Sequence, residues 1–151
     1  MENKGAKISV QKLTGLLQSD FVPPFHPFRE YFSSLPEWDG ADHIAELADQ
    51  VQTTDQKYWV ICLRKWITAL VASAIEDDIV NHTVLIFVGG QGIGKTTYFL
   101  SLIPLELKEY IYSGSLNPDD KDSLIHISEC ILVNLDELET LTKYKESALK
   151  E

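Results

Sequence analysis

The sequence predicts an α/β fold in which a small all-helical region precedes a partial parallel sheet flanked by helices. Apolar residues recur at helical spacing through the first half of the chain, to about residue 76. The pattern then changes to continuous apolar runs at 83–88 and 131–135, which are typical of strands buried on both faces of a parallel sheet. A glycine-rich stretch joins the first of these runs to a further helical pattern.

A chain of 151 residues is long enough for one good hydrophobic core or two small ones. Residues 1–24 are polar and weakly patterned and end in Pro23-Pro24, so they are interpreted as a leader or linker. We expect the helical region over residues 25–80 and the partial α/β domain over residues 81–151.

Three helices are expected in the helical region, at 27–35, 42–51 and 56–76. The longest has one broad apolar face, made of Trp59, Leu63, Trp66, Ile67, Leu70, Val71 and Ala74. The aromatic residues are interpreted as core residues, and stacking of Trp38 or Trp59 on a nucleic-acid base is the alternative.

The chain is acidic, with a net charge of −10 and a sequence pI of about 4.8. Such a surface repels phosphate backbones on average, and only two of the basic residues are arginines, Arg29 and Arg64. These properties argue against a broad basic surface for nucleic acid but not against a local basic groove.

Cys62 and Cys130 lie in separate apolar runs and lack metal-binding spacing, so both are expected to be reduced core thiols. The N-terminus lacks the apolar segment of a signal peptide. The longest apolar stretch, 58–75, contains Arg64 and Lys65 and is expected to be too polar to span a bilayer. We therefore expect a cytoplasmic protein with no membrane partner.

The glycine-rich stretch fits the phosphate-loop pattern G-x-x-x-x-G-K-[ST], known as Walker A. The pattern is carried by Gly89, Gly90, Gln91, Gly92, Ile93, Gly94, Lys95 and Thr96, and Thr97 extends the expected nucleotide-binding segment. By chance the pattern occurs on the order of once in 10⁴ to 10⁵ starting positions. Here it also follows an expected strand and opens an expected helix, which predicts a P-loop nucleotide-binding core.

Each residue type in this loop has a chemical reason. Glycines let the backbone wrap around an anion, and successive amide groups then point inward. Lys95 places a positive charge on the β- and γ-phosphates and is expected to be catalytic, whereas the Thr96 hydroxyl is expected to bind Mg²⁺. A glycine-rich turn without a ligand is the alternative.

The second expected strand, 131–135, ends in Asp136-Glu137. Asp136 is expected to hold Mg²⁺ and Glu137 to act as the catalytic group that orients and polarises the attacking water. The alternative is that Asp136 only caps a helix, and Glu129 is a weaker candidate acid. Between the two motifs we expect a short strand at 109–113 and a helix at 123–128.

Three parts of the sequence together resemble the virulence-associated protein E family of bacterial mobile elements and phages. They are Pro27–Phe32 with Leu35–Gly40, then Gly90–Thr96, then Leu135–Glu139. The resemblance covers about residues 25–151. It implies a likeness to superfamily 3 helicases or primase-linked replicative ATPases, in which Gly94, Lys95 and Thr96 bind phosphate and metal and the acidic pair completes the hydrolytic site.

The resemblance also implies further strands, a polar γ-phosphate sensor and an arginine finger, for which the 15 residues after Asp136 leave no room. The chain is therefore expected to be C-terminally truncated. DNA as a partner and a ring-shaped homo-oligomer of the full-length protein follow from the resemblance alone, and the chain itself is expected to be monomeric.

These observations favour an ATP-binding, Mg²⁺-dependent ATPase module of a helicase-like replication protein, with little turnover by this chain. A P-loop kinase acting on a small molecule is the first alternative, although adjacent acids favour water as the nucleophile. A non-catalytic interaction module that binds nucleotide as a structural ligand is the second.

Overall fold

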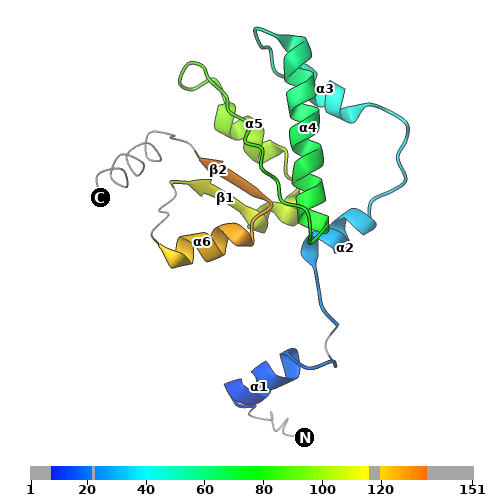
Figure 1. The fold of residues 1–151 in the computed structure, drawn as a ribbon, viewed down its shortest axis with the longest axis vertical. Helices are drawn as coiled ribbons and strands as arrows, with labels where there is room; N and C mark the ends of the chain where they lie inside the picture. Colours follow the sequence, from blue (N-terminus) through cyan, green and yellow to red (C-terminus); the bar gives the residue numbers. More distant parts are fainter. Residues whose placement is uncertain (1–7, 22, 116–119, 136–151) are drawn as a thin grey trace, which may run out of the picture.

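The computed structural model describes residues 8–21, 23–115 and 120–135 (Figure 1). In chain order the elements are α1 (Val10–Leu17), α2 (Pro27–Ser33), α3 (His43–Asp49), α4 (Gln56–Ile75), α5 (Lys95–Ser101), the 3₁₀ helix η1 (Leu105–Tyr110), β1 (Ile111–Gly114), α6 (Lys121–Ser128) and β2 (Leu132–Leu135).

Helix α1 lies in the segment 1–24, which the sequence predicts to be a leader or linker. Ser9 caps it by accepting a hydrogen bond from the Lys12 amide. Its apolar residues are exposed, and Figure 1 shows the helix apart from the other elements. The segment therefore has local order without joining the core.

Helices α2, α3 and α4 begin and end within two residues of their expected positions. Their starts are set by side chains that accept hydrogen bonds from the first turn: His26 for α2, Asp42 for α3 and Asp55 for α4. Pro27 opens α2, where its missing amide hydrogen costs nothing.

Helix α4 carries the centre of the hydrophobic core, with Trp59, Leu63, Trp66 and Leu70 buried on one face. The Trp59 indole also donates a hydrogen bond to the Ala48 carbonyl at 3.0 Å. The core interpretation of Trp59 is confirmed, and its alternative role as a base-stacking residue is wrong. Trp38 is 77% exposed, so the expectation that it belongs to the core is wrong.

By length and mean hydropathy, α4 would be able to cross a membrane, contrary to the expectation that it is too polar. The helix instead packs on α2 and α3 within this structure. A core helix passes the same test of length and composition, so its packing is the more informative observation.

Strands β1 and β2 pair in parallel, with Ile111 opposite Leu132 and Gly114 opposite Leu135. Helix α6 connects them, as parallel pairing requires a crossover. The strand expected at 131–135 is confirmed, and the one expected at 109–113 is shifted by about two residues because η1 continues to Tyr110.

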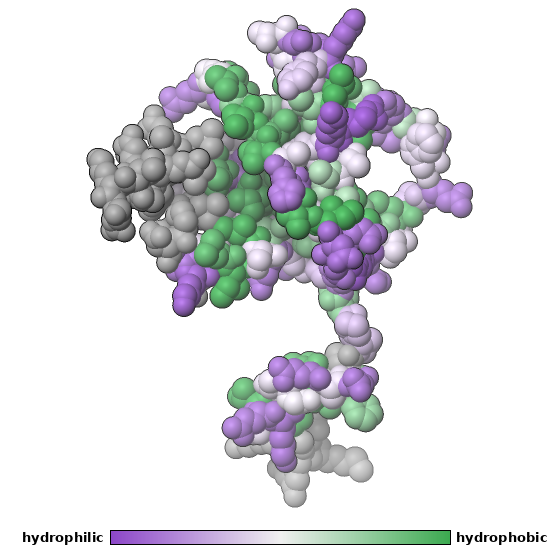
Figure 2. Space-filling view, in the orientation of Figure 1, coloured by the Kyte–Doolittle hydropathy of each residue, from purple (hydrophilic) through white to green (hydrophobic). Residues whose placement is uncertain are grey.

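The run 83–88 is extended but is not part of the sheet, so the expectation of a doubly buried strand is wrong. Among the described residues no backbone hydrogen bond joins it to β1 or β2. Leu85 and Phe87 pack against the core, whereas Val84, Ile86 and Val88 are 79%, 55% and 95% exposed. Figure 2 shows a band of apolar side chains across this side of the molecule.

A groove of about 540 Å³ lies between this run and β2. Its lining includes Leu85 and Phe87 on one side and Leu132 and Asn134 on the other. The continuous apolar pattern predicts that this run pairs directly with a neighbouring strand, but the groove separates the run from β2. An apolar run is buried on both faces only where other elements cover both faces.

Candidate functional site

The loop expected to bind phosphate connects the extended run 83–88 to helix α5. Gly92 and Gly94 have φ angles of 78° and 87°, in the left-handed region that glycine adopts without a steric penalty. Gly94 is also the N-cap residue of α5. The loop therefore needs glycine at two positions of the pattern for reasons of backbone conformation alone.

Lys95 folds back over this loop. Its ammonium Nζ donates hydrogen bonds to the carbonyl oxygens of Gly89 at 2.9 Å and of Gly90 at 2.6 Å. These contacts hold the positive charge beside the exposed turn instead of letting the long side chain extend into solvent. The lysine charge is thus held against the backbone of the loop itself.

The remaining loop residues are open to solvent. Gly89 to Gly94 are exposed, as are Gln91 and Ile93 within that range, and Thr97 is exposed on the first turn of α5. Lys95 and Thr96 are half-buried and both line the groove beside β2. The structure thus brings Lys95 and Thr96 to the edge of β2 and leaves the turn accessible to a ligand.

Aromatic side chains support the loop from behind. Phe87, just before the loop, lies 5.1 Å from the Trp59 ring and 5.6 Å from the Tyr98 ring, measured between centroids. The Tyr98 hydroxyl donates to the Leu47 carbonyl at 3.4 Å, and burial raises the pKa of this tyrosine above its usual value. Both ends of the loop are therefore anchored on α3 and α4.

Strand β2 places a polar side chain next to this loop. Asn134 is 9% exposed, and its amide Nδ2 donates to the Ser113 hydroxyl on β1 at 3.0 Å. Asn134 lines the same groove as Lys95 and Thr96. Sequence reasoning missed this residue because a single asparagine inside an apolar run shows its burial only once the strand register is known.

The expected acidic pair, Asp136 and Glu137, lies outside the described residues. Leu135, the last residue of β2, directly precedes it in the sequence. Within the described part of the chain, no three His, Cys, Asp or Glu side chains form a cluster able to hold a metal ion.

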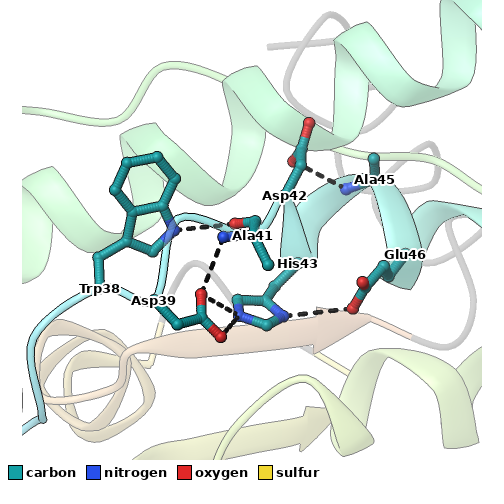
Figure 3. A network of polar contacts seen from close by, with 7 residues as sticks. All are labelled: Trp38, Asp39, Ala41, Asp42, His43, Ala45 and Glu46. Carbon is teal, nitrogen blue, oxygen red and sulfur yellow. Dashed lines mark hydrogen bonds and ion pairs between the residues drawn. The ribbon is translucent and has the colours of Figure 1, made fainter.

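A second polar cluster spans the turn before α3 and the first turn of that helix, and it was also missed (Figure 3). The His43 ring lies between two carboxylates, with Nε2 3.0 Å from Asp39 and Nδ1 3.2 Å from Glu46. Hydrogen bonds to Glu46 and Asp39 raise the pKa of His43, and hydrogen bonds from the Ala41 amide and His43 lower the pKa of Asp39. The i, i+3 and i, i+4 spacing of these residues was the available signal.

This cluster is exposed and serves the turn before the helix. The Trp38 indole donates to the Ala41 carbonyl at 2.8 Å, and Asp42, which caps α3, also pairs with Arg64 on α4. The contacts order residues 38–46 against α4, and they lie on a different element from the phosphate loop.

The sequence model of the virulence-associated protein E-like domain matches residues 32–151. The searches among curated proteins and among solved structures each found no match. The family match covers most of the chain, and it fits a replication-associated protein of a phage or mobile element. The chain belongs to the virulence-associated protein E-like domain family.

Proposed function

We propose that this chain is the nucleotide-binding part of a Mg²⁺-dependent ATPase within a helicase-like replication protein. The observation that carries the proposal is the loop of Gly89 to Thr96, in which two glycines have left-handed backbone and Lys95 is held beside the exposed turn. The fold expected for it is a partial P-loop core, with ATP and Mg²⁺ as ligands.

The loop has the properties that a polyphosphate site requires. Its glycines leave the backbone open to close approach, so that amide groups can donate to phosphate oxygens. Lys95 is half-buried and already fixed by two carbonyl oxygens, so little side-chain entropy is lost when it meets the β- and γ-phosphates. Affinity here comes from positioned charge rather than from apolar contact.

Metal and water chemistry are assigned to Thr96 of α5 and to the acidic pair that follows β2 in the sequence. The Thr96 hydroxyl and Asp136 are the oxygen donors that suit Mg²⁺, which neutralises phosphate charge when bound. Glu137 is assigned the role of orienting the attacking water. Adjacent acids favour water over a second substrate as the nucleophile, which ranks hydrolysis above a small-molecule kinase activity.

The wider setting is proposed from family membership. By analogy with this family, we propose that the full-length protein is cytoplasmic, acts on DNA and assembles as a ring. The acidic composition of this chain gives no support to nucleic acid as its own direct ligand.

Isothermal titration with ATP and Mg²⁺ tests the proposal. Lys95→Ala removes a charged hydrogen bond worth about 1.5–3 kcal/mol, so affinity falls by roughly 10- to 100-fold. Lys65→Ala, which removes an exposed lysine on α4, is the matched control and leaves affinity unchanged. Equal binding by the wild-type protein and Lys95→Ala would overturn the site.

Turnover is measured separately, as phosphate release with and without a set of small-molecule acceptors. We expect slow release to water and no dependence on the acceptor. Acceptor-dependent transfer would favour the kinase alternative, and tight binding with no release under any condition would favour a structural nucleotide.

A further inference from the structure

We propose that the turn between α2 and α3 is a docking surface for a basic segment of another protein, which places an arginine side chain on Trp38. This Trp38 surface consists of Glu37, Trp38, Asp39 and Glu46, all of which are exposed. It lies on other elements than the phosphate loop, so the inference stands whether or not ATP binds there.

Trp38 remains in solvent although the fold buries the other two tryptophans. It is 77% exposed, whereas Trp59 and Trp66 are 5% and 9% exposed and belong to the core. A tryptophan buries about 150–250 Å² when it is covered, and tryptophan is enriched among the residues that dominate binding energy at protein interfaces. Trp38 therefore offers a large aromatic area that a second protein can bury.

Hydrogen bonds hold this side chain in one orientation (Figure 3). The indole Nε1 donates to the Ala41 carbonyl at 2.8 Å, and the Asp39 carboxylate accepts from the Ala41 amide at 2.9 Å. Because the one polar atom of the indole is already bonded, the exposed part of the ring is its π system. A ring fixed in this way loses little conformational entropy when a partner covers it.

The charge around Trp38 identifies the partner as basic. The sequence has no Lys or Arg from residue 30 to residue 56. Glu37 makes no ion pair with any residue that the structure describes, and His43, which lies between two carboxylates, is charged only when protonated. The surface therefore attracts cations and repels phosphate groups. The acidic residues of this stretch are Glu30, Glu37, Asp39, Asp42, Glu46, Asp49 and Asp55.

An arginine side chain suits both the ring and the charge. Its planar guanidinium stacks on the face of an indole, and the N–H groups in its plane remain free to donate to a carboxylate. The ammonium group of lysine is a compact charge that is more strongly hydrated, so it gains less from the same ring. We therefore infer arginine as the residue that contacts Trp38.

Two other occupants fit this surface less well. A nucleic-acid base can stack on a tryptophan, but the phosphates on either side of it would be repelled by the neighbouring carboxylates. A second copy of this chain has only two arginines, and both are already paired, Arg29 with Asp77 and Arg64 with Asp42. A basic segment of a different protein remains as the occupant.

The test follows the tryptophan indole N–H signals by NMR during titration with a blocked tetra-arginine peptide at about 0.15 M salt. The Trp38 signal is assigned by its absence in Trp38→Phe. The control peptide contains citrulline, which has nearly the shape of arginine but no charge. We expect the arginine peptide to shift the Trp38 signal and leave those of Trp59 and Trp66 in place, and the citrulline peptide to shift none.

Variants separate the ring from the charge. Trp38→Leu keeps an apolar side chain but removes the π system, so affinity for the arginine peptide should fall by about 3- to 10-fold, and Trp38→Phe should fall less. Glu37→Gln should lose about 2-fold. Glu106→Gln removes the same charge from an exposed position on η1 and should leave the affinity unchanged. Circular dichroism confirms that each variant is folded.

Four results would overturn the proposal. The first is equal affinity of the wild-type protein and Trp38→Leu for the arginine peptide. The second is a shift of the Trp59 or Trp66 signal without one at Trp38. The third is tighter, Trp38-dependent binding of oligo-dT than of the peptide, which would assign base stacking to this residue. The fourth is self-association in size-exclusion chromatography that Trp38→Leu abolishes, which would assign the surface to a second copy.

Discussion

At the scale of single residues, Gly94 shows how backbone conformation constrains the loop. Its φ of 87° is strained for any residue with a Cβ, although a Cβ there would meet no atom within 4 Å. Gly94→Ala should therefore lower the free energy of unfolding by about 1–2 kcal/mol through backbone strain alone. Chemical denaturation measures the change.

Gly90→Ala is the matched control within the same loop. A Cβ at Gly90 would make only an ordinary contact, 3.9 Å from Ile93, and the residue does not have a positive φ. Its substitution should change stability by less than about 0.5 kcal/mol. Equal destabilisation by the two variants would contradict the conformational argument.

The residues of the loop were predictable because the motif names residue types whose physical roles are local. Gly92 and Gly94 supply positive φ, and Lys95 reaches back over the turn, all within seven positions of Gly89. Asn134 was not predictable in this way, because its partner Ser113 lies 21 residues earlier and meets it only through the strand register.

At the scale of elements, the helices were easier to predict than the sheet. Helices α2, α3 and α4 follow from local spacing and from capping by residues such as Asp42 and Asp55. The run 83–88 has the composition of a buried strand, yet pairing depends on a neighbour that local sequence does not specify. Val84, Ile86 and Val88 are exposed because no neighbouring strand covers that face of the run.

The start of α3 carries a pH-dependent contact that can be measured. The pKa of His43 is raised above its ordinary value of 6.5, so the folded state favours the protonated ring. Its stabilisation is fully present below about pH 6.5 and is lost as pH rises through the folded-state pKa. The lowered pKa of Asp39 acts oppositely, stabilising above its ordinary 3.8 and losing effect in stronger acid.

His43→Gln should therefore be less stable than the wild-type protein at about pH 5.5 and equal to it at about pH 8.5. The difference should be small, because the cluster is exposed to solvent and screened by salt. Thermal unfolding at the two pH values measures it. In an Asp39→Asn, Glu46→Gln background the His43 substitution should lose its pH dependence; persistence of that dependence would assign it to another group.

At the scale of the whole molecule, one hydrophobic core spans the expected boundary near residue 80. It includes Trp59 and Leu63 of α4 together with Ile103, Leu107 and Leu132 of the α/β part. The periodicity change at that point marks a change of secondary structure, not a break in packing. The acidic composition gives no information on how the two parts join.

Because the core is shared, we expect ligand binding at the loop to change the surroundings of aromatic residues in the helical region. The Trp59 ring contacts Phe87 just before the loop and Tyr98 just after it, with centroid distances of 5.1 Å and 6.4 Å. Tryptophan emission depends on such contacts, so ATP with Mg²⁺ should change the intrinsic fluorescence. Trp38→Phe should keep that change, because Trp38 is exposed on the turn before α3.

Trp59→Phe, confirmed as folded by circular dichroism, should lose most of the change, and Lys95→Ala should lose it at ATP concentrations that saturate the wild-type protein. Trp66 contacts Phe99 on the same helix as Tyr98 and would contribute any remainder. A signal that survives in Trp59→Phe but disappears in Trp38→Phe would place the response on the exposed turn, and the loop would then not be coupled to α4 through the core.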